Sequence, residues 1–308
     1  MSLAADPLLL AGVGLLAGVV ASLLGLGGGL LMTPFLAALG VPLALVVPTS
    51  TCAIAGTALL TGVLNWRQRA GGDLRLAAVT TVAMLPALEA STWVNRWLRT
   101  LPAGTADALI GTTFIAMMAW SLWAVLRPGP ARTGPDPWPG PGMALGDGRR
   151  CSLLRLGIGG TLAGFLGGLL GIGGGRVLVP LFSGPLGLAI KAAIATSSLC
   201  ILLSACYSAA SFSAKGLVDM HTALWLLSGS LPGAWLGTLG LKHVDPERLR
   251  RTYGELSITA MAAMGLSQFG FRLSALALLL AACAWVGWVA LRSILRPVVV
   301  LKEPTICA

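Results

Sequence analysis

The sequence predicts an all-α protein that crosses a membrane several times, and three observations lead to this prediction. Hydrophobic residues make up 56% of the 308 residues, charged residues only 10%, and the mean hydropathy is +0.85. A soluble domain carries about 25% charged residues. The apolar residues form long runs without strand-like alternation, and several runs reach the roughly 20 residues that a helix needs to span a bilayer. Helices are the expected spanning element because they satisfy their own backbone hydrogen bonds in lipid.

The sequence contains an internal repeat, which predicts two related halves. Leu-Gly-Leu-Gly-Gly-Gly at 24–29 leads to Pro34, and Leu-Gly-Ile-Gly-Gly-Gly at 170–175 leads to Pro180 at the same spacing. Two hydroxyl triplets and two Asp–Pro pairs follow in the same order: Thr49, Ser50 and Thr51 with Thr196, Ser197 and Ser198, then Asp73 and Pro86 with Asp219 and Pro232. A duplicated unit explains this shared order better than chance does.

Each half is expected to be a glycine-broken helical hairpin followed by three transmembrane helices. In the first half the hairpin arms are 7–26 and 30–40, and the spans are 44–65, 74–93 and 104–126. The expected domains are a first transmembrane repeat over 1–127, a cytoplasmic linker rich in Pro and Gly over 128–152, a second repeat over 153–270, and one extra C-terminal transmembrane helix with a cytoplasmic tail over 271–308.

The charge distribution predicts that the two repeats are inverted. Three spans per half is an odd number, so the second hairpin enters the membrane from the side opposite to the first. Most Lys and Arg residues then lie on one side of the membrane, as the positive-inside rule requires. The N-terminus is expected in the periplasm and the C-terminus in the cytoplasm of a bacterial inner membrane. No Lys or Arg precedes Arg67, so the first segment lacks the basic start of a signal peptide and is expected to be retained.

Composition and motifs argue against several other functions. The net charge of +10 comes from cations between apolar runs, so it does not indicate nucleic-acid binding. The six cysteines include no Cys-x-x-Cys pair, and the sequence has neither a His/carboxylate cluster with metal spacing nor a phosphate-binding glycine loop. We therefore expect no cofactor, no metal and no enzyme activity.

The glycine breaks are the first candidate for a binding site. Glycines inside a helix cost about 1 kcal/mol each relative to alanine, so two matching runs need an explanation. Broken helices expose N–H groups that attract anions, and paired breaks in inverted repeats are typical of the central site of a transporter. The candidate residues are Gly27, Gly28 and Gly29 with Gly173, Gly174 and Gly175. The alternative is that these glycines only permit tight helix packing.

Polar side chains near the breaks complete the candidate substrate site. The triplets Thr49-Ser50-Thr51 and Thr196-Ser197-Ser198 offer hydroxyl donors to an oxyanion, or else cap a helix or bond back to a carbonyl. Arg176 directly follows the second break, where the first half has Leu30. An Arg inside a membrane is a functional hypothesis by default, here an anion ligand. The alternative is that Arg176 snorkels to the interface or pairs with a carboxylate.

Glu89 and Lys191 are candidates for coupling or gating. Glu89 lies inside a predicted span, where it carries a proton, pairs with a cation in an outer vestibule, or is simply an interfacial acid. Lys191 precedes the second triplet and either attracts anions at the cytoplasmic mouth or only follows the positive-inside rule.

These residues resemble the sulfite exporter TauE/SafE family. A duplicated Leu-Gly-x-Gly-Gly-Gly-x-x-x-x-Pro, followed each time by Thr-Ser, carries the resemblance over about 10–270. The matching positions are Gly25, Gly27, Gly28, Gly29 and Pro34, then Gly171, Gly173, Gly174, Gly175 and Pro180, and Thr49, Ser50, Thr196 and Ser197. The resemblance implies secondary transport, often export, of sulfur-containing anions such as sulfite, sulfoacetate and other organosulfonates, without an ATPase.

One passage departs from the family pattern. The second half has the small-residue form Pro232-Gly233-Ala234-Trp235-Leu236-Gly237, whereas the first half has Pro86-Ala87-Leu88-Glu89-Ala90-Ser91. Close helix packing is therefore less expected in the first half.

The main hypothesis is a secondary transporter that exports sulfite or an organosulfonate by alternating access around a midplane site at the two breaks. Rocking of one half against the other would expose this site to each side in turn. The expected partners are a small anionic substrate and the lipid bilayer, with a coupling proton as an open alternative; the chain is expected to be a monomer or a homodimer. An anion channel and a non-transporting membrane scaffold are the alternatives from other classes.

Overall fold

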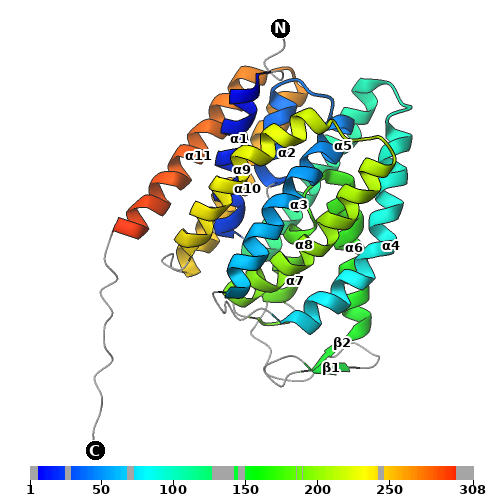
Figure 1. Ribbon diagram of the computed structural model, residues 1–308, viewed down its shortest axis with the longest axis vertical. Helices are drawn as coiled ribbons and strands as arrows, with labels where there is room; N and C mark the ends of the chain where they lie inside the picture. Colours follow the sequence, from blue (N-terminus) through cyan, green and yellow to red (C-terminus); the bar gives the residue numbers. More distant parts are fainter. Residues whose placement is uncertain are drawn as a thin grey trace, which may run out of the picture.

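The computed structural model is a bundle of helices with a small β-hairpin at one end (Figure 1). It describes residues 6–24, 29–67, 73–126, 142–144, 150–184, 186–188, 190–241 and 246–295. The first-half helices are α1 (Pro7–Leu24), α2 (Gly29–Ala38), α3 (Leu43–Arg67), α4 (Leu74–Leu98) and α5 (Ala103–Leu126). The second-half helices are α6 (Leu153–Leu170), α7 (Gly175–Ser183), α8 (Ile190–Ala214), α9 (Met220–Leu241) and α10 (Pro246–Gln268), followed by α11 (Arg272–Leu295). The order of long and short helices in one half thus repeats in the other.

Five of the described helices are long and apolar enough to cross a membrane. Their spans are Leu43–Leu64, Leu74–Leu98, Gly104–Ala124, Leu153–Leu170 and Ala192–Ala214. The first three coincide with the predicted spans of the first half, except that α4 continues five residues past the predicted end at 93. The prediction of an all-α polytopic membrane protein is confirmed.

Aspartates fix where two of the helices begin. The carboxylate of Asp73 accepts hydrogen bonds from the backbone N–H groups of Arg75 at 2.9 Å and Leu76 at 3.1 Å, which makes it the N-cap of α4. Asp219 precedes α9 and accepts in the same way from the N–H of His221 at 3.2 Å. The Thr222 hydroxyl also donates to this carboxylate, and that bond lowers the pKa of Asp219 below its ordinary value.

The predicted linker contains a short β-hairpin in its described part. β1 (Gly142–Ala144) pairs antiparallel with β2 (Arg150–Ser152), so that Met143 lies opposite Cys151. This hairpin is an addition to the extended polar segment that the Pro and Gly content predicted. It leads directly into α6, at the end of the bundle from which α6 rises (Figure 1).

Equivalent helices of the two halves run in opposite directions. α1 descends from the end of the bundle opposite to the β-hairpin, whereas α6 rises from the hairpin (Figure 1). α3 and α8 pack side by side, and the thiol of Cys52 in the first part of α3 lies 3.8 Å from the hydroxyl of Ser213 at the end of α8. These two helices are therefore antiparallel. Two inverted repeats require this arrangement, and the direction of each half within a membrane stays a prediction.

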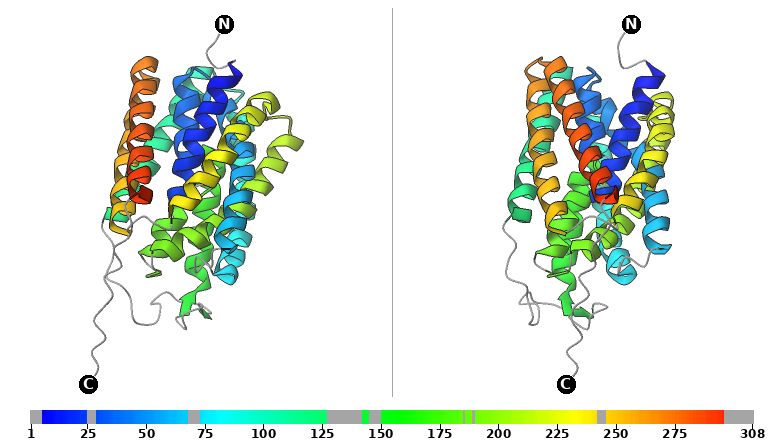
Figure 2. Two further views of the ribbon diagram at one scale, coloured as in Figure 1. Left: turned by 60° about the vertical axis from the view of Figure 1, so that its left-hand side comes forward. Right: turned by 90° about the vertical axis from the view of Figure 1, so that its left-hand side faces the viewer.

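Many of the packed helix pairs combine one helix from each half. α1 packs on α9, and α6 packs on α4, so the first helix of each half lies against the fourth helix of the other. Figure 2 shows α1 in dark blue alongside α9 in yellow. In the same manner α3 packs on α9 and α8 packs on α4, while α5 lies against α10. The halves are thus interlocked and do not form two separate blocks.

Glycines let α1 and α9 approach each other at backbone distance. A Cβ atom added at Gly14 or Gly18 would strike backbone atoms of α9, and one added at Gly229, Gly233 or Gly237 would strike backbone atoms of α1. Small residues at such spacing are the usual means by which membrane helices pack closely. The glycines of this pair are therefore fixed by packing.

The expectation of looser packing around 86–91 is wrong, because α6 supplies the small residues that α4 lacks. A Cβ atom at Gly164 would lie 2.6 Å from the carbonyl oxygen of Met84, and one at Gly160 would lie 2.9 Å from that of Thr80. A Cβ atom at Gly168 would strike the side chain of Ser91. The close approach is thus kept, with its glycines on the partner helix.

We predict that Gly233→Ala lowers the stability of the folded protein, since its methyl group would strike the carbonyl of Leu15 on α1. Overpacking of this kind costs about 1–3 kcal/mol. Gly12→Ala is the matched control: it lies on α1 with open space around its Cβ position, so it should be neutral or slightly stabilising. Thermal denaturation in detergent measures both, and equal midpoints for the two variants would contradict the packing argument.

Candidate functional site

The second glycine break is a tight left-handed turn between α6 and α7. Gly171, Gly173 and Gly174 have φ angles of 65°, 72° and 75°, which only glycine adopts without strain. The N–H of Ile172 bonds back to the carbonyl of Gly167 at 3.0 Å and closes the end of α6. Gly174 then caps the start of α7. The backbone conformation itself therefore requires glycine at Gly171, Gly173 and Gly174, whereas Gly175 is already the first residue of the helix.

This break lies against the two central antiparallel helices. The Ser50 hydroxyl of α3 lies 3.4 Å from the carbonyl of Gly171. The Cβ position of Gly173 falls within 3.5 Å of Ile54 on α3 and 3.0 Å of Ile201 on α8. The break is buried throughout, from Gly171 to Arg176. It therefore occupies the interior of the bundle.

Arg176, the second residue of α7, extends between α5 and α10 and is completely buried. Its Cζ lies 5.7 Å from the ring centroid of Tyr253 on α10, and its Nη1 contacts the sulfur of Met118 on α5. The Ser121 hydroxyl lies 3.0 Å from the carbonyl oxygen of Arg176 and is also hydrogen-bonded to the Tyr253 hydroxyl. We call Arg176, Met118, Ser121 and Tyr253 the Arg176 site.

The guanidinium of Arg176 has no compensating negative charge in the described part of the chain. Its Nε and Nη2 are buried there without a hydrogen-bond partner, so it neither snorkels to the surface nor pairs with a carboxylate. Leaving a buried charge unpaired costs several kcal/mol. A cation–π contact returns only about 0.5–2 kcal/mol of that. Two strong donors therefore remain available for an anion.

The first residue of each hydroxyl triplet links the two halves to each other. The Thr196 hydroxyl on α8 accepts a hydrogen bond from the N–H of Asp73 at 3.1 Å, and the Thr49 hydroxyl on α3 accepts one from the N–H of Asp219 at 3.3 Å. Each bond joins one half to the start of a helix in the other. Those two helix starts, of α4 and α9, lie at opposite ends of the bundle (Figure 1).

The remaining hydroxyls bond back to their own helices. Ser50 and Thr51 donate to the carbonyl of Val47 at 3.1 and 2.8 Å. Ser197 and Ser198 donate to that of Ile194 at 2.9 and 2.8 Å. In this conformation these four hydroxyls therefore bond back to a carbonyl, which was one of the alternatives that the sequence left open.

Among the described residues, the structure brings only part of the predicted substrate site together. Ser50 reaches the second break, whereas the described contacts of Arg176 are with α5 and α10. Gly27 and Gly28 lie outside the described residues, and Gly29 begins α2, so the meeting of the two breaks stays a prediction. Lys191 lies in the first turn of α8, and its side chain is outside the described part of the structure.

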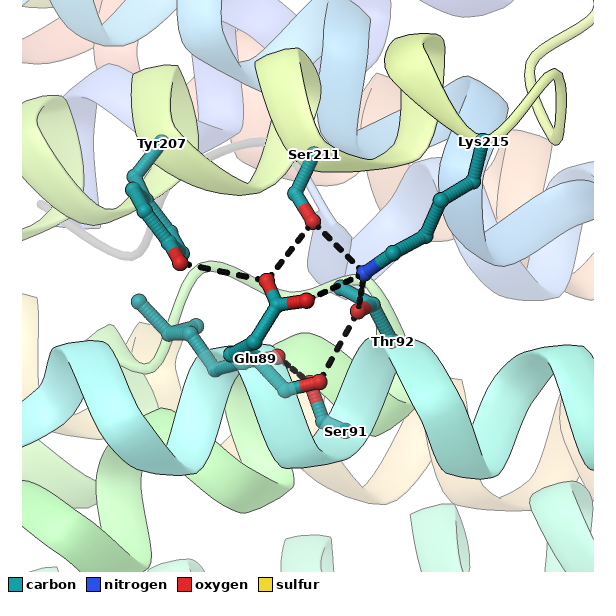
Figure 3. Close-up of polar contacts among 7 residues, drawn as sticks. Glu89, Ser91, Thr92, Tyr207, Ser211 and Lys215 are labelled. Carbon is teal, nitrogen blue, oxygen red and sulfur yellow. Dashed lines mark hydrogen bonds and ion pairs between the residues drawn. The ribbon is translucent and has the colours of Figure 1, made fainter.

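Glu89 forms the centre of a polar network between α4 and α8 (Figure 3). Its carboxylate pairs with the Lys215 ammonium at 2.6 Å and accepts hydrogen bonds from Ser211 at 2.8 Å and Tyr207 at 3.1 Å. Lys215 also contacts the Thr92 hydroxyl. Pairing with a cation was one of the alternatives for Glu89, and Lys215 is that cation.

Sequence reasoning missed Tyr253, Ser121 and Asn95. The chain has only two tyrosines, and both face a charged group: Tyr253 faces Arg176 and Tyr207 donates to Glu89. The scarcity of tyrosine in the sequence could therefore have pointed to these two positions as candidate partners of charged groups. Asn95 is buried in α4, and its side-chain amide has no partner among the described residues. A single Asn in an apolar helix is a signal of the same kind.

Comparison with known proteins identifies the family. The model of the family described as sulfite exporter TauE/SafE matches residues 10–266. The chain belongs to the TauE/SafE family. It is also 30% identical over 252 residues to the probable membrane transporter protein YunE of Bacillus subtilis (strain 168), an alignment that covers 73% of this chain and 83% of the relative. No solved structure matches the chain.

The family assignment makes this chain a multi-pass membrane transporter and points away from an enzyme. It confirms the resemblance read from the duplicated glycine motif. Both glycine runs and both hydroxyl triplets lie inside the matched range.

We predict that Lys215→Met destabilises the protein, because it leaves the partly buried Glu89 carboxylate without its cation. Glu89→Gln in the same chain should restore most of the loss, since a neutral amide needs no counterion. The coupling between the two changes should be about 1 kcal/mol, because both side chains are partly solvated. Denaturation midpoints of the wild type, the two single variants and the double variant give this coupling; strictly additive effects would contradict the network.

Proposed function

We propose that this TauE/SafE transporter exports sulfite or a small organosulfonate, with Arg176 as its principal anion ligand. The observation that carries the proposal is a completely buried guanidinium with two unpaired donors at the start of a broken helix. Sulfonate and sulfite oxygens match the planar donors of Arg, which bind oxyanions in a bidentate manner. The family assignment supports sulfur-containing anions as the substrate class.

The described residues suggest how the site would open. Arg176 is enclosed in this conformation, so the contact between α5, α7 and α10 has to separate before an anion enters. Backbone contacts at glycine join α1 to α9 and α4 to α6, and both pairs combine the two halves. The moving units we propose are therefore these mixed pairs, in place of rocking between the two sequence halves. The Glu89 network between α4 and α8 suits a gate because it ties one such pair to a central helix.

The charge distribution supports a bacterial inner-membrane location with the N-terminus in the periplasm and the C-terminus in the cytoplasm. In this orientation the β-hairpin and the start of α6 face the cytoplasm. The turn between α10 and α11 faces the periplasm.

A channel would share the buried cation and the glycine breaks, so an electrical measurement has to distinguish it from a transporter. A carrier moves one anion per conformational cycle, whereas an open pore passes large single-channel currents. Recordings from planar bilayers are expected to show no unitary currents in sulfite or sulfoacetate. Resolved openings would favour the channel.

We expect Arg176→Ala to reduce anion-driven flux in proteoliposomes about 10- to 100-fold, because a charged hydrogen-bond donor contributes about 1.5–3 kcal/mol. Sulfite, sulfoacetate and taurine are the substrates to compare. Arg176→Lys keeps the charge without the planar fork and should retain partial flux. Arg251→Ala removes an exposed Arg from a surface ion pair with Glu247 and is the control with normal flux. Wild-type flux in Arg176→Ala would exclude Arg176 as the ligand.

Gly174→Ala tests the alternative of a non-transporting scaffold. Its φ of 75° is unfavourable for alanine, and the new Cβ would lie 2.9 Å from the carbonyl of Ala163. If Gly174 shapes the anion site, the variant should lose flux even under conditions where it stays folded. Gly157→Ala, on α6 with open space at its Cβ, should keep both fold and flux. A stability loss in Gly174→Ala with unchanged flux per folded molecule would favour packing alone.

A further inference from the structure

A cavity of about 290 Å³ opens at the end of the bundle opposite to the β-hairpin. It is formed where the α2–α3 turn, the start of α5 and the turn between α10 and α11 meet. Its polar lining comes from four side chains, which are Asp107, Ser267, Gln268 and Arg272. Its volume is close to that of the smaller ligand pockets of proteins.

The cavity is lined by one negative and one positive side chain that form no ion pair with each other among the described residues. Asp107 and Arg272 both line it, yet no ion pair joins them in the described part of the chain. The Arg272 guanidinium lies against Gly40, whose Cβ position is 2.6 Å from Nη1. This guanidinium makes no hydrogen bond to another described residue. Two opposite charges therefore lie at one small cavity, with no ion pair between them in the described part of the chain.

Helix stability does not explain this placement of Arg272. It is the first residue of α11, and a cation at a helix start is opposed by the helix dipole. Asp107 has a structural bond, since one carboxylate oxygen accepts from the N–H of Leu43 at 2.7 Å. That bond fixes the carboxylate at the cavity and leaves its second oxygen for another donor.

The cavity also lies over the two helices that form the Arg176 site. Asp107 and Met118 are on α5, and eleven residues of helix separate them by about 16 Å. Gln268 and Tyr253 are both on α10, which packs against α5 along this length. A molecule bound in the cavity would thus lie at one end of the contact between α5 and α10, which has to separate in the proposed opening.

We propose that this cavity binds a small zwitterion that carries an ammonium group and a sulfonate or carboxylate group on a short chain. The ammonium group pairs with Asp107 and the oxyanion with Arg272, while the Gln268 amide lies beside them. A simple anion would satisfy only one of the two charges. The site is separate from Arg176, so its occupancy does not depend on the proposed transport reaction.

The test uses the full-length Arg176→Ala protein in detergent, in which the outer cavity is intact and the deeper anion ligand is absent. Calorimetry measures binding of taurine and β-alanine, which are zwitterions, and of ethanesulfonate and ethylamine, which each lack one of the two charges. We expect both zwitterions to bind about tenfold more tightly than either single-charge compound, since each charged hydrogen bond contributes about 1.5 kcal/mol or more. A preference between taurine and β-alanine identifies the sulfonate or the carboxylate as the favoured group.

Two further variants assign the charges to the two residues. Asp107→Asn keeps an oxygen that can accept from Leu43, and it should remove the preference for taurine over ethanesulfonate. Arg272→Gln should remove the preference for taurine over ethylamine. Equal affinity of taurine and ethanesulfonate for the parent protein would overturn the proposal, as would the absence of measurable binding by either zwitterion. Neither result depends on flux through the Arg176 site.

Discussion

The close approach of helix backbones at glycine is the constraint on which the rest of this structure depends. α1 meets α9, and α6 meets α4, at distances that admit no Cβ atom at the contact positions. Lipid offers no hydrophobic drive for helices to associate, so close packing of small residues has to hold such pairs together. Each pair combines one helix from the first half with one from the second. These contacts therefore require the two halves to interlock.

Interlocking in turn places the polar groups. The bonds of Thr49 to the start of α9 and of Thr196 to the start of α4 exist because the halves interlock and α3 and α8 run antiparallel. The same arrangement brings Lys215, at the end of α8, next to Glu89 on α4. These polar contacts are hydrogen bonds and an ion pair between elements that the glycine interfaces have already brought together. They stabilise one conformation of the interface, and the proposed opening of the transporter would have to break them.

The fold could be predicted from the sequence because its signals are local and repeated. Long apolar runs gave the spans of α3, α4 and α5 to within a few residues, and the duplicated glycine motif gave the equivalence of α6–α7 with α1–α2. Arg176 could be singled out from the sequence because a charged side chain within an apolar segment costs free energy, whichever neighbour it faces.

What could not be predicted depends on rotation about a helix axis and on partners far away in the chain. The spacing of Arg176 and the triplets from the break does not tell which neighbour each side chain faces. Arg176 contacts Tyr253 on α10, whereas Thr196 bonds to the start of α4. The partner of Glu89 lies on another helix, and no local pattern points to Lys215. The packing of α4 was misjudged because its own passage lacks the glycines that α6 provides.

If Arg176 binds the anion as proposed, the difference between the halves limits the charge of that anion. The scaffold repeats, but the position that holds Arg176 in α7 holds the buried, apolar Leu30 in α2. The repeat thus contributes one buried cation where strict symmetry would give two or none. A singly charged oxyanion neutralises one guanidinium, whereas a second negative charge would remain unpaired in a medium that stabilises it poorly. A symmetric pair of glycine breaks with a single arginine is therefore better matched to a monoanionic sulfonate or hydrogen sulfite than to a dianion. Under the proposed function, this asymmetry assigns the anion to the second break, since only that break is directly followed by a charged residue.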